Sequence, residues 1–237
     1  MINSRKVIGI IGGMGPMATA DMFRKIIERT DAACDREHLH ILIDNNTDIP
    51  DRTASILAGS DEPVKYMAAS ARRLADAGAD MLIISCDTSH FFYDKVSADC
   101  DIPILHMPEE TAKVMSKMGI RCAGLLATDG TVRSGVYDAI FAKYGIELVK
   151  PDADGQKKLM HMIYDEVKAG KRADTSALES TLDDMEEQGC EAFILGCTEL
   201  PIAYEGYIGR NFLDPAVCVA ETAIIAAGGK VKSEVTV

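Results

Sequence analysis

Two cysteines in similar sequence surroundings are the residues with the clearest chemical potential. Cys86 follows the apolar run in AGADMLIISCDT (77–88), and Cys197 follows the apolar run in QGCEAFILGCT (188–198). An unperturbed thiol has a pKa of about 8.5, so it can exchange a proton near neutral pH. Two matched thiols that face one ligand could remove a proton from one side of a carbon atom and return a proton to the other side.

Each of these cysteines, taken alone, has a simpler explanation. A single cysteine after an apolar strand is more often an inert core side chain than a reactive group. For Cys86 a second chemistry stays open, because His90 follows it by four residues and a thiol–imidazole pair is the nucleophile of cysteine hydrolases. Glu199, two residues after Cys197, could orient a group in the site or cap a helix. The inert interpretation is assigned to the remaining cysteines: Cys34, Cys100, Cys122, Cys190 and Cys218.

Strand-like and helix-like segments alternate around the two cysteines. Short apolar runs predict strands at 6–11, 38–43, 80–85, 103–105, 121–126, 146–149, 191–195 and 211–213. Apolar residues at helical spacing predict helices at 17–33, 63–77, 109–117, 132–143, 155–168, 176–188 and 216–227. This alternation is typical of an α/β fold whose parallel sheets are covered on both faces. Ligands of such folds bind beyond the carboxyl ends of the strands, which is where both cysteines fall.

The sequence also indicates an internal repeat. KVIGIIGGMGP (6–16) resembles RCAGLLATDGT (121–131), and Gly78 precedes Cys86 by eight residues, as Gly189 precedes Cys197. We therefore predict two pseudo-symmetric lobes, each a mostly parallel sheet flanked by helices, with the active site in the cleft between them. The expected boundaries are 1–104 for the N-terminal lobe, with 215–237 returning to it, and 105–214 for the C-terminal lobe.

Charge and composition narrow the possible partners. Lys plus Arg number 25 and Asp plus Glu 37, and the resulting net charge of −12 repels nucleic-acid phosphates. No apolar stretch reaches the roughly 18 residues of a membrane span, and the first apolar run leads into glycines rather than a signal-peptide cleavage site. Seven scattered cysteines are typical of reduced thiols in the cytoplasm. We expect a cytoplasmic protein with a small-molecule ligand, no nucleic-acid or membrane partner, and no metal at the loosely spaced Cys34, His38 and His40.

Several motifs together resemble those of the aspartate/glutamate racemase family. They are GGMGPMAT (12–19), the asparagine pair at 45–46, DIPDRT (48–53), SCDTSH (85–90) and GCTELP (196–201). The enzymes of that family need no cofactor, use two cysteines and consist of two pseudo-symmetric α/β lobes. The resemblance covers nearly the whole chain. It implies a homodimeric amino-acid racemase that works without pyridoxal phosphate or metal.

The resemblance also implies roles for individual residues. Cys86 and Cys197 match the acid/base pair that transfers the Cα proton of an acidic amino acid. Arg52 and Thr53 match the loop that receives the side-chain carboxylate of the substrate, and Lys168 matches a second cation at that carboxylate. The other matches are Met14, in the glycine-rich loop that lines the site, and Thr88 and Thr198, which hold the α-carboxylate.

One position departs from the family pattern. The family reads Pro-Cys-Asn-Thr-Ala-His where this chain has residues 85–90, so Asp87 replaces an asparagine whose amide is expected to donate a hydrogen bond to the substrate. An ionised Asp87 cannot donate, and two like charges about 4 Å apart cost roughly 4 kcal/mol at an effective dielectric constant near 20. The alternatives are a racemase with altered substrate preference or low activity, a binding protein that has kept the cleft, and a cysteine hydrolase that uses Cys86 with His90.

Overall fold

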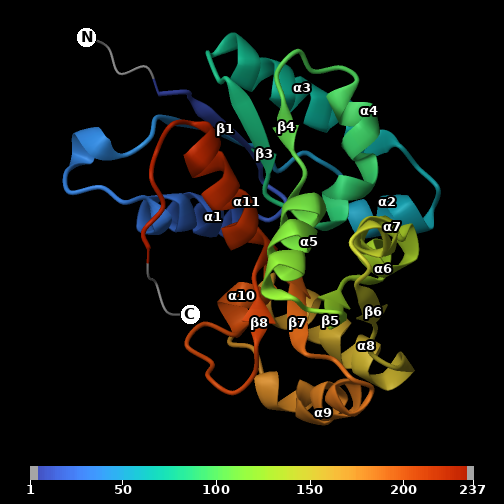
Figure 1. Ribbon diagram of the computed structural model, residues 1–237. Coiled ribbons are helices and arrows are strands. Elements are labelled where there is room, and N and C mark those ends of the chain that lie inside the picture. The colour runs from blue at the N-terminus through green and yellow to red at the C-terminus, as the bar shows by residue number, and fades with distance from the viewer. Residues whose placement is uncertain (1–4, 234–237) are drawn as a thin grey trace.

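The computed structural model describes residues 5–233, which form two four-stranded sheets (Figure 1). Every strand pair is parallel, and the strand order is β2-β1-β3-β4 in the first sheet and β6-β5-β7-β8 in the second. The predicted α/β class with two parallel, helix-flanked sheets is therefore confirmed. The strands are β1 (Ile8–Gly12), β2 (Ile41–Asn45), β3 (Met81–Ile84), β4 (Ile104–Leu105), β5 (Cys122–Ala127), β6 (Glu147–Val149), β7 (Ala192–Gly196) and β8 (Phe212–Leu213).

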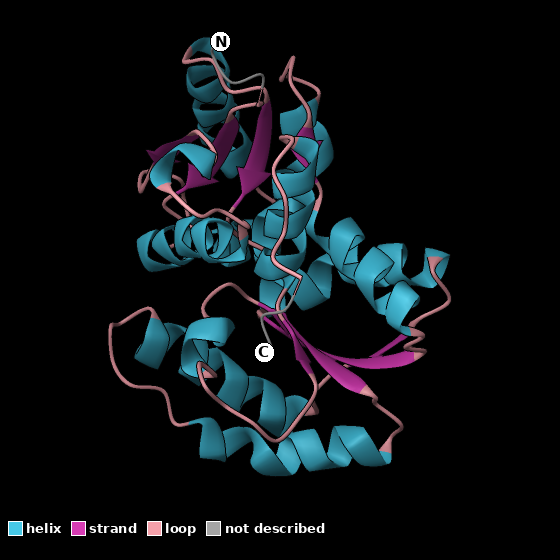
Figure 2. Cartoon of the chain, turned by 60° about the vertical axis from the view of Figure 1, so that its left-hand side comes forward, coloured by secondary structure: helices cyan, strands magenta, loops and turns pink. Residues whose placement is uncertain are grey.

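Helices surround both sheets, as the cyan and magenta elements of Figure 2 show. The α-helices are α1 (Pro16–Arg29), α2 (Arg52–Leu57), α3 (Glu62–Asp76), α4 (Tyr93–Ser97), α5 (Met107–Met118), α6 (Asp129–Ser134), α7 (Val136–Lys143), α8 (Ala153–His161), α9 (Glu179–Glu187), α10 (Leu200–Ala203) and α11 (Pro215–Ala226). Short 3₁₀ segments are η1 (Asp35–Glu37), η2 (Thr88–Phe92) and η4 (Thr175–Leu178), and η3 (Met162–Val167) is a π-helix. Between residues 5 and 233, no helix combines the length and the apolar character that crossing a membrane requires.

The internal repeat is present in the register of the two sheets. Gly9 of β1 is paired with Leu82 of β3, and Gly124 of β5 is paired with Phe193 of β7. A Cβ atom at Gly9 would lie 2.5 Å from Leu82 Cδ2, and one at Gly124 would lie 2.5 Å from Phe193 Cδ1. Each glycine therefore leaves room for a large side chain of the strand beside it, which is β3 for Gly9 and β7 for Gly124. These are the two strands that lead to Cys86 and Cys197.

Alanine at either of these glycines is expected to destabilise the fold. Gly9→Ala and Gly124→Ala should each lower the free energy of unfolding by about 1–3 kcal/mol, because an added methyl group has to displace a packed core side chain. Denaturant unfolding followed by circular dichroism would measure both changes. Because the two positions are equivalent in the repeat, the two costs should be similar, and a cost below about 0.5 kcal/mol at either position would contradict this account.

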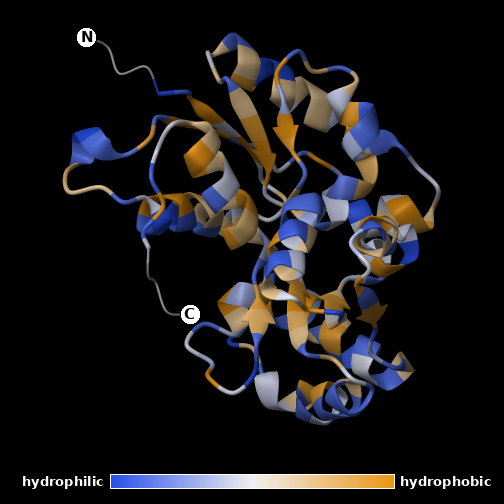
Figure 3. Cartoon of the chain, viewed as in Figure 1, coloured by the Kyte–Doolittle hydropathy of each residue, from blue (hydrophilic) through white to orange (hydrophobic). Residues whose placement is uncertain are grey.

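Each sheet lies between two apolar layers of side chains. The strands themselves are mostly orange in Figure 3, whereas the helices are mixed in hydropathy. On one face of the first sheet, Ile8 and Ile10 pack with residues of α1 and α11. On its other face, Leu82 and Ile84 pack with α3 and α4. The second sheet has the same construction, with α5 and α7 on one face and α8, η3 and α9 on the other. Because both faces are buried, the strands carry continuous apolar runs instead of alternating patterns.

The last helix, α11, lies against the first sheet although it follows the last strand of the second. Val219 and Ile224 of α11 belong to the same buried cluster as Ile8 and Ile10. Lys25 of α1 forms ion pairs with Asp21 and, at 2.5 Å, with Asp214 at the start of α11. The C-terminal helix therefore joins the end of the chain to the N-terminal sheet.

Several helices differ from the predicted segments. The helix predicted at 132–143 is interrupted at Gly135, where φ is 66° and the residue ends α6 before α7 begins. The helix predicted at 155–168 changes from α to π at Met162. The short helices α2, α4 and α10 were not predicted, because segments of six, five and four residues are too short to show a helical period.

Candidate active site

Both predicted cysteines line one small cavity between the two sheets. β3 ends at Ile84, two residues before Cys86, and β7 ends at Gly196, directly before Cys197. The cavity has a volume of about 10 Å³, which is the space that about one water molecule needs. An amino acid is larger than that, so its binding requires the walls to move apart. Other predicted residues that line the cavity are Arg52, Thr53, Asp87, Thr88, Lys168, Thr198 and Glu199.

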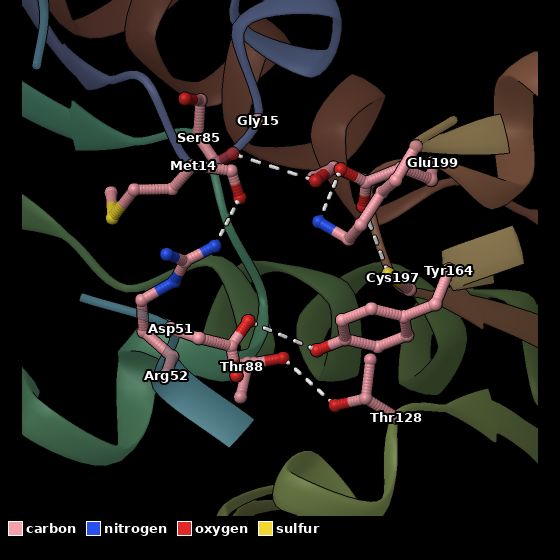
Figure 4. A network of polar contacts seen from close by, with 12 residues as sticks. Met14, Gly15, Asp51, Arg52, Ser85, Thr88, Thr128, Tyr164, Cys197 and Glu199 are labelled. Carbon is pink, nitrogen blue, oxygen red and sulfur yellow. Dashed lines mark hydrogen bonds and ion pairs between the residues drawn. The ribbon is translucent and has the colours of Figure 1, made fainter. Parts of the chain in front are cut away.

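Cys197 is part of a chain of polar contacts that runs from the buried thiol through buried Glu199 to the partly exposed Lys168. Its thiol donates to Glu199 Oε2 at 3.0 Å, and Lys168 Nζ lies 2.8 Å from Glu199 Oε1 (Figure 4). Burial, and then the negative charge of Glu199, hold the pKa of Cys197 well above its ordinary value. Burial lowers the pKa of Lys168, but Glu199 and the cysteine sulfurs outweigh it and raise that pKa overall. The arrangement favours a protonated thiol at Cys197 and an ammonium at Lys168.

Glu199→Gln is expected to lower the pKa of Cys197, because it removes the negative charge next to the sulfur and leaves the Lys168 ammonium in place. The midpoint of Cys197 alkylation by iodoacetamide should therefore move to lower pH, as mass spectrometry of the modified peptide would show. Glu205→Gln is a suitable control, since Glu205 is exposed and pairs with Arg24 on the surface. An alkylation midpoint that stays at the wild-type pH would show that Glu199 does not control the thiol.

Arg52 is the first residue of α2, a helix whose start is capped by the Asp51 side chain, which accepts from Ala54 N at 2.7 Å. Its guanidinium donates to the carbonyl oxygens of Met14, at 2.9 Å, and of Pro50, at 3.1 Å. These contacts hold the side chain in a buried position, 8% exposed. Burial opposes the charge of Arg52, but the Cys86 sulfur and the Asp51 carboxylate together raise its pKa. Arg52 is therefore a fixed cation next to Cys86.

Asp87 is buried opposite a tyrosine of the second lobe. It is 1% exposed, and its Oδ1 accepts a hydrogen bond from the hydroxyl of Tyr137, a fully buried residue of α7. Burial raises the pKa of Asp87 to about 7, against the lowering effect of the Tyr137 hydroxyl, and the Asp214 and Glu199 carboxylates add to the increase. The carboxyl of Asp87 is therefore poised between its neutral and charged forms near neutral pH.

Threonine hydroxyls connect the two halves of the chain around the cavity. Thr88 Oγ1 lies 3.0 Å from Thr128 Oγ1 and 2.8 Å from Thr131 Oγ1, and the Thr53 hydroxyl donates to Thr128 Oγ1 at 3.2 Å. The Thr198 hydroxyl donates to the Ser85 carbonyl at 3.5 Å. These side chains come from α2, α6, the loops after β5 and β7, and the start of η2. The cavity is therefore rich in hydroxyl donors that could hold a carboxylate.

Two predicted site residues lie outside the cavity wall. Met14 is buried behind Arg52, with its carbonyl bonded to the guanidinium and its sulfur accepting from Ser89 Oγ at 3.3 Å. His90 is buried against the rings of Tyr93 and His106, its pKa is held well below the ordinary value by burial, and neither ring nitrogen has a hydrogen-bond partner among residues 5–233. The thiol–imidazole pair that a hydrolase would need is therefore not formed.

Three further cavity residues, Asp51, Thr128 and Tyr164, were not predicted. Thr128 directly follows β5, so the rule that ligands bind at the carboxyl ends of strands would have located it. Asp51 caps α2, a helix too short to be recognised from its sequence, so no local signal indicated this residue. Tyr164 belongs to the π-helix η3, and its hydroxyl donates to Asp51 Oδ2 at 3.2 Å. Nothing in the local sequence pattern indicates that Tyr164 would reach the cavity. In the described part of the chain, no group of His, Cys, Asp and Glu side chains is suited to hold a metal ion.

A family model described as Asp/Glu/Hydantoin racemase matches residues 11–223. The match includes both cysteines and every strand of the two sheets except the first three residues of β1. The chain belongs to this racemase family. The family that the sequence motifs indicated is thereby confirmed.

Individual relatives extend the same result. The broad specificity amino-acid racemase RacX of Bacillus subtilis is 26% identical over 225 residues, which are 92% of this chain and 96% of RacX. The structure of an aspartate racemase from Picrophilus torridus superposes with a TM-score of 0.82 at 30% identity, covering 96% of each chain. An aspartate racemase homologue from Pyrococcus horikoshii OT3 gives a TM-score of 0.76 at 25% identity, covering 94% of this chain and 99% of the other. Racemase-family membership and these relatives support an amino-acid racemase activity, which is an isomerase chemistry.

Proposed function

We propose that the protein racemises an acidic amino acid without a cofactor, by transferring the Cα proton between Cys86 and Cys197. The observation that carries the proposal is that thiols from equivalent strand ends of the two sheets line the same small cavity. A substrate held between them would present one face of its Cα atom to each sulfur. Two bases on opposite faces are what inversion of a stereocentre requires.

The two thiols have different surroundings, which suggests how the reaction starts. Arg52 offers a positive charge next to Cys86, whereas the Cys197 thiol donates a hydrogen bond to Glu199 and keeps its proton. In one direction, the Cys86 thiolate accepts the Cα proton and the Cys197 thiol delivers its own proton to the opposite face. In the other direction the roles are exchanged, and the Lys168 ammonium offsets the charge of the Cys197 thiolate. The hydroxyls of Thr88 and Thr198 would stabilise the negative charge that develops on the α-carboxylate.

The cations of the cavity favour a substrate with a second carboxylate. Arg52 is a buried guanidinium whose Nε has no hydrogen-bond partner within residues 5–233. A carboxylate supplies the acceptor that such a group lacks. The names of the aspartate racemase of Picrophilus torridus and of the broad specificity enzyme RacX set the range of substrates to test, from aspartate and glutamate to neutral amino acids.

The test is a chiral assay in heavy water against a panel of acidic and neutral amino acids. A two-base racemase inverts the substrate and introduces deuterium from the solvent at Cα. A cysteine hydrolase would consume the substrate and release a different product, and a binding protein would change neither handedness nor label. The absence of inversion for every amino acid of the panel would contradict the proposed function. A homodimer stays a prediction, which size-exclusion chromatography with light scattering would check.

A further inference from the structure

Two buried groups in the cavity wall lack a partner. Within residues 5–233, the buried side-chain atoms without a hydrogen bond include Arg52 Nε and Asp87 Oδ2, and both residues line the cavity between Cys86 and Cys197. Buried polar atoms are nearly always satisfied, so an unsatisfied pair in one cavity indicates the position of ligand atoms. The guanidinium can only donate, and it therefore requires an acceptor. What Asp87 requires depends on whether its carboxyl carries a proton.

The contacts of Asp87 favour the protonated carboxyl. A carboxylate buried at 1% exposure with one oxygen unpartnered is far more costly than a neutral acid in the same place. The Tyr137 hydroxyl donates to Oδ1, which makes Oδ1 the carbonyl-like oxygen and leaves Oδ2 to hold the proton. The negative groups around it add to this preference, and the nearby cations Lys25 and Lys168 are paired with other carboxylates. Three titratable groups act on Asp87: Tyr137 of α7, Asp214 before α11 and Glu199 after β7. Asp214 is paired with Lys25 of α1, and Glu199 is paired with Lys168, which follows η3. Arg52 of α2, Lys168 and the two cysteines line the same cavity as Asp87.

We infer that Asp87 acts as a neutral carboxylic acid, held by Tyr137 at Oδ1, and donates a hydrogen bond from Oδ2 to a carboxylate of the substrate. This inference rests on the proposed racemase function. It assigns Asp87 a role in substrate specificity, because the neutral form of Asp87 adds no negative charge to the cavity. Lys168 is paired there with Glu199, and the guanidinium of Arg52 donates to carbonyl oxygens and keeps its net charge. The carboxylate of an acidic amino acid can then bind next to the positively charged Arg52. Loss of the Asp87 proton places a negative charge in the cavity that Arg52 also lines and removes the donor, so acidic substrates are rejected in favour of neutral ones as the pH rises.

Asparagine at this position provides a matched variant. Asp87→Asn keeps the shape of the side chain and the acceptor for Tyr137, and it replaces the acid proton with an amide donor that does not titrate. The variant therefore separates the charge of Asp87 from its size. Tyr137→Phe removes the hydroxyl that stabilises the charged form, so it should extend the protonated form of Asp87 to higher pH.

The first measurement needs no substrate. The folded protein holds the Asp87 proton up to a pH of about 7, whereas the unfolded chain releases it near 3.8. Between those values Asp87 binds more protons in the folded than in the unfolded state, so its contribution to the stability of the wild type falls as the pH rises and levels off above about 7. Asp87→Asn has no ionisable group at this position and therefore lacks this pH-dependent loss of stability. The melting temperature of the variant should therefore exceed that of the wild type by a larger margin at about pH 8 than at about pH 5. An equal margin at both pH values would overturn the inference.

The second measurement is the pH profile of kcat/KM for aspartate in the same two proteins. In the wild type the value should fall about tenfold per pH unit above the pH at which Asp87 ionises, while Asp87→Asn should show no such fall. Tyr137→Phe should move the fall to higher pH. A profile that is the same in the wild type and in Asp87→Asn would overturn the inference. A wild-type activity that rises through that pH and is lost in Asp87→Asn would also overturn it, because it would make Asp87 a carboxylate that binds the substrate ammonium. Absence of racemisation in all three proteins at every pH would instead overturn the proposed function.

Discussion

Cys86→Ser and Cys197→Ser are each expected to lower kcat/KM for racemisation by about 10³-fold or more, since a positioned acid or base contributes roughly 10²–10⁴-fold. A serine hydroxyl is much less acidic than a thiol, so it can neither serve as a ready base nor return the proton efficiently. Both cysteines are buried in the cavity wall, and serine is close in size to cysteine. The loss should therefore occur with the fold intact, as circular dichroism and thermal unfolding would verify.

The handedness of residual exchange makes this test sharper. Each variant keeps one thiol, which can still remove the Cα proton from the enantiomer that faces it. Proton NMR in heavy water should show slow deuterium incorporation into one enantiomer in Cys86→Ser and into the opposite enantiomer in Cys197→Ser. If Cys197→Ser remained fully active while Cys86→Ser was inactive, a one-cysteine hydrolase would explain the protein better.

Two other cysteines provide controls for these variants. Cys190 is buried in the core beside β7, away from the cavity, and Cys34 is exposed. Cys190→Ser tests the effect of losing a buried thiol, and Cys34→Ser tests the effect of losing a surface thiol. Both should racemise within about threefold of the wild type, because surface and non-site changes rarely alter chemistry directly.

Arg52→Gln is expected to lower kcat/KM for aspartate by about 10²-fold, since a hydrogen bond to a charged group contributes about 1.5–3 kcal/mol and each 1.36 kcal/mol is tenfold. The variant removes the buried positive charge that would face the second carboxylate of the substrate. A neutral amino acid lacks that carboxylate, so its kcat/KM should fall much less. The measurement is therefore a ratio of kcat/KM values for aspartate and alanine in the wild type and the variant.

The structural role of Arg52 requires its own control. The guanidinium also donates to the Met14 and Pro50 carbonyls, so its loss could loosen the loops around the cavity. Equal losses for aspartate and alanine would indicate this structural effect and would contradict a role in substrate selection. Arg73→Gln is the matched surface variant, because Arg73 is 55% exposed and pairs with Asp44 outside the cavity. It should leave the ratio unchanged.

The site shows which inferences from sequence were sound. Cys86 and Cys197 were predicted to approach one ligand because both follow apolar strands at equivalent places of a repeat, and they line the same cavity. Arg52 and Lys168 were selected with the help of the family resemblance and Glu199 from its position after Cys197, and all three line the cavity as well. Their catalytic and binding roles stay predictions until the variants are measured. His90 was chosen from its spacing to Cys86 alone, and its ring packs against His106, where burial holds its pKa well below the ordinary value.

Local information in the chain was sufficient for the parallel α/β architecture and for the repeat. Apolar runs, helical spacing and the positions of Gly9 and Gly124 depend on neighbours along the sequence, and buried strands leave a pattern that can be read there. The contacts between the halves leave no such pattern. Tyr137 reaches Asp87 across fifty positions of the chain, and Tyr164 reaches Asp51 across more than a hundred. Only folding could establish those contacts and the burial of Asp87, because the charge state of a side chain depends on the water and the charges that surround it in space.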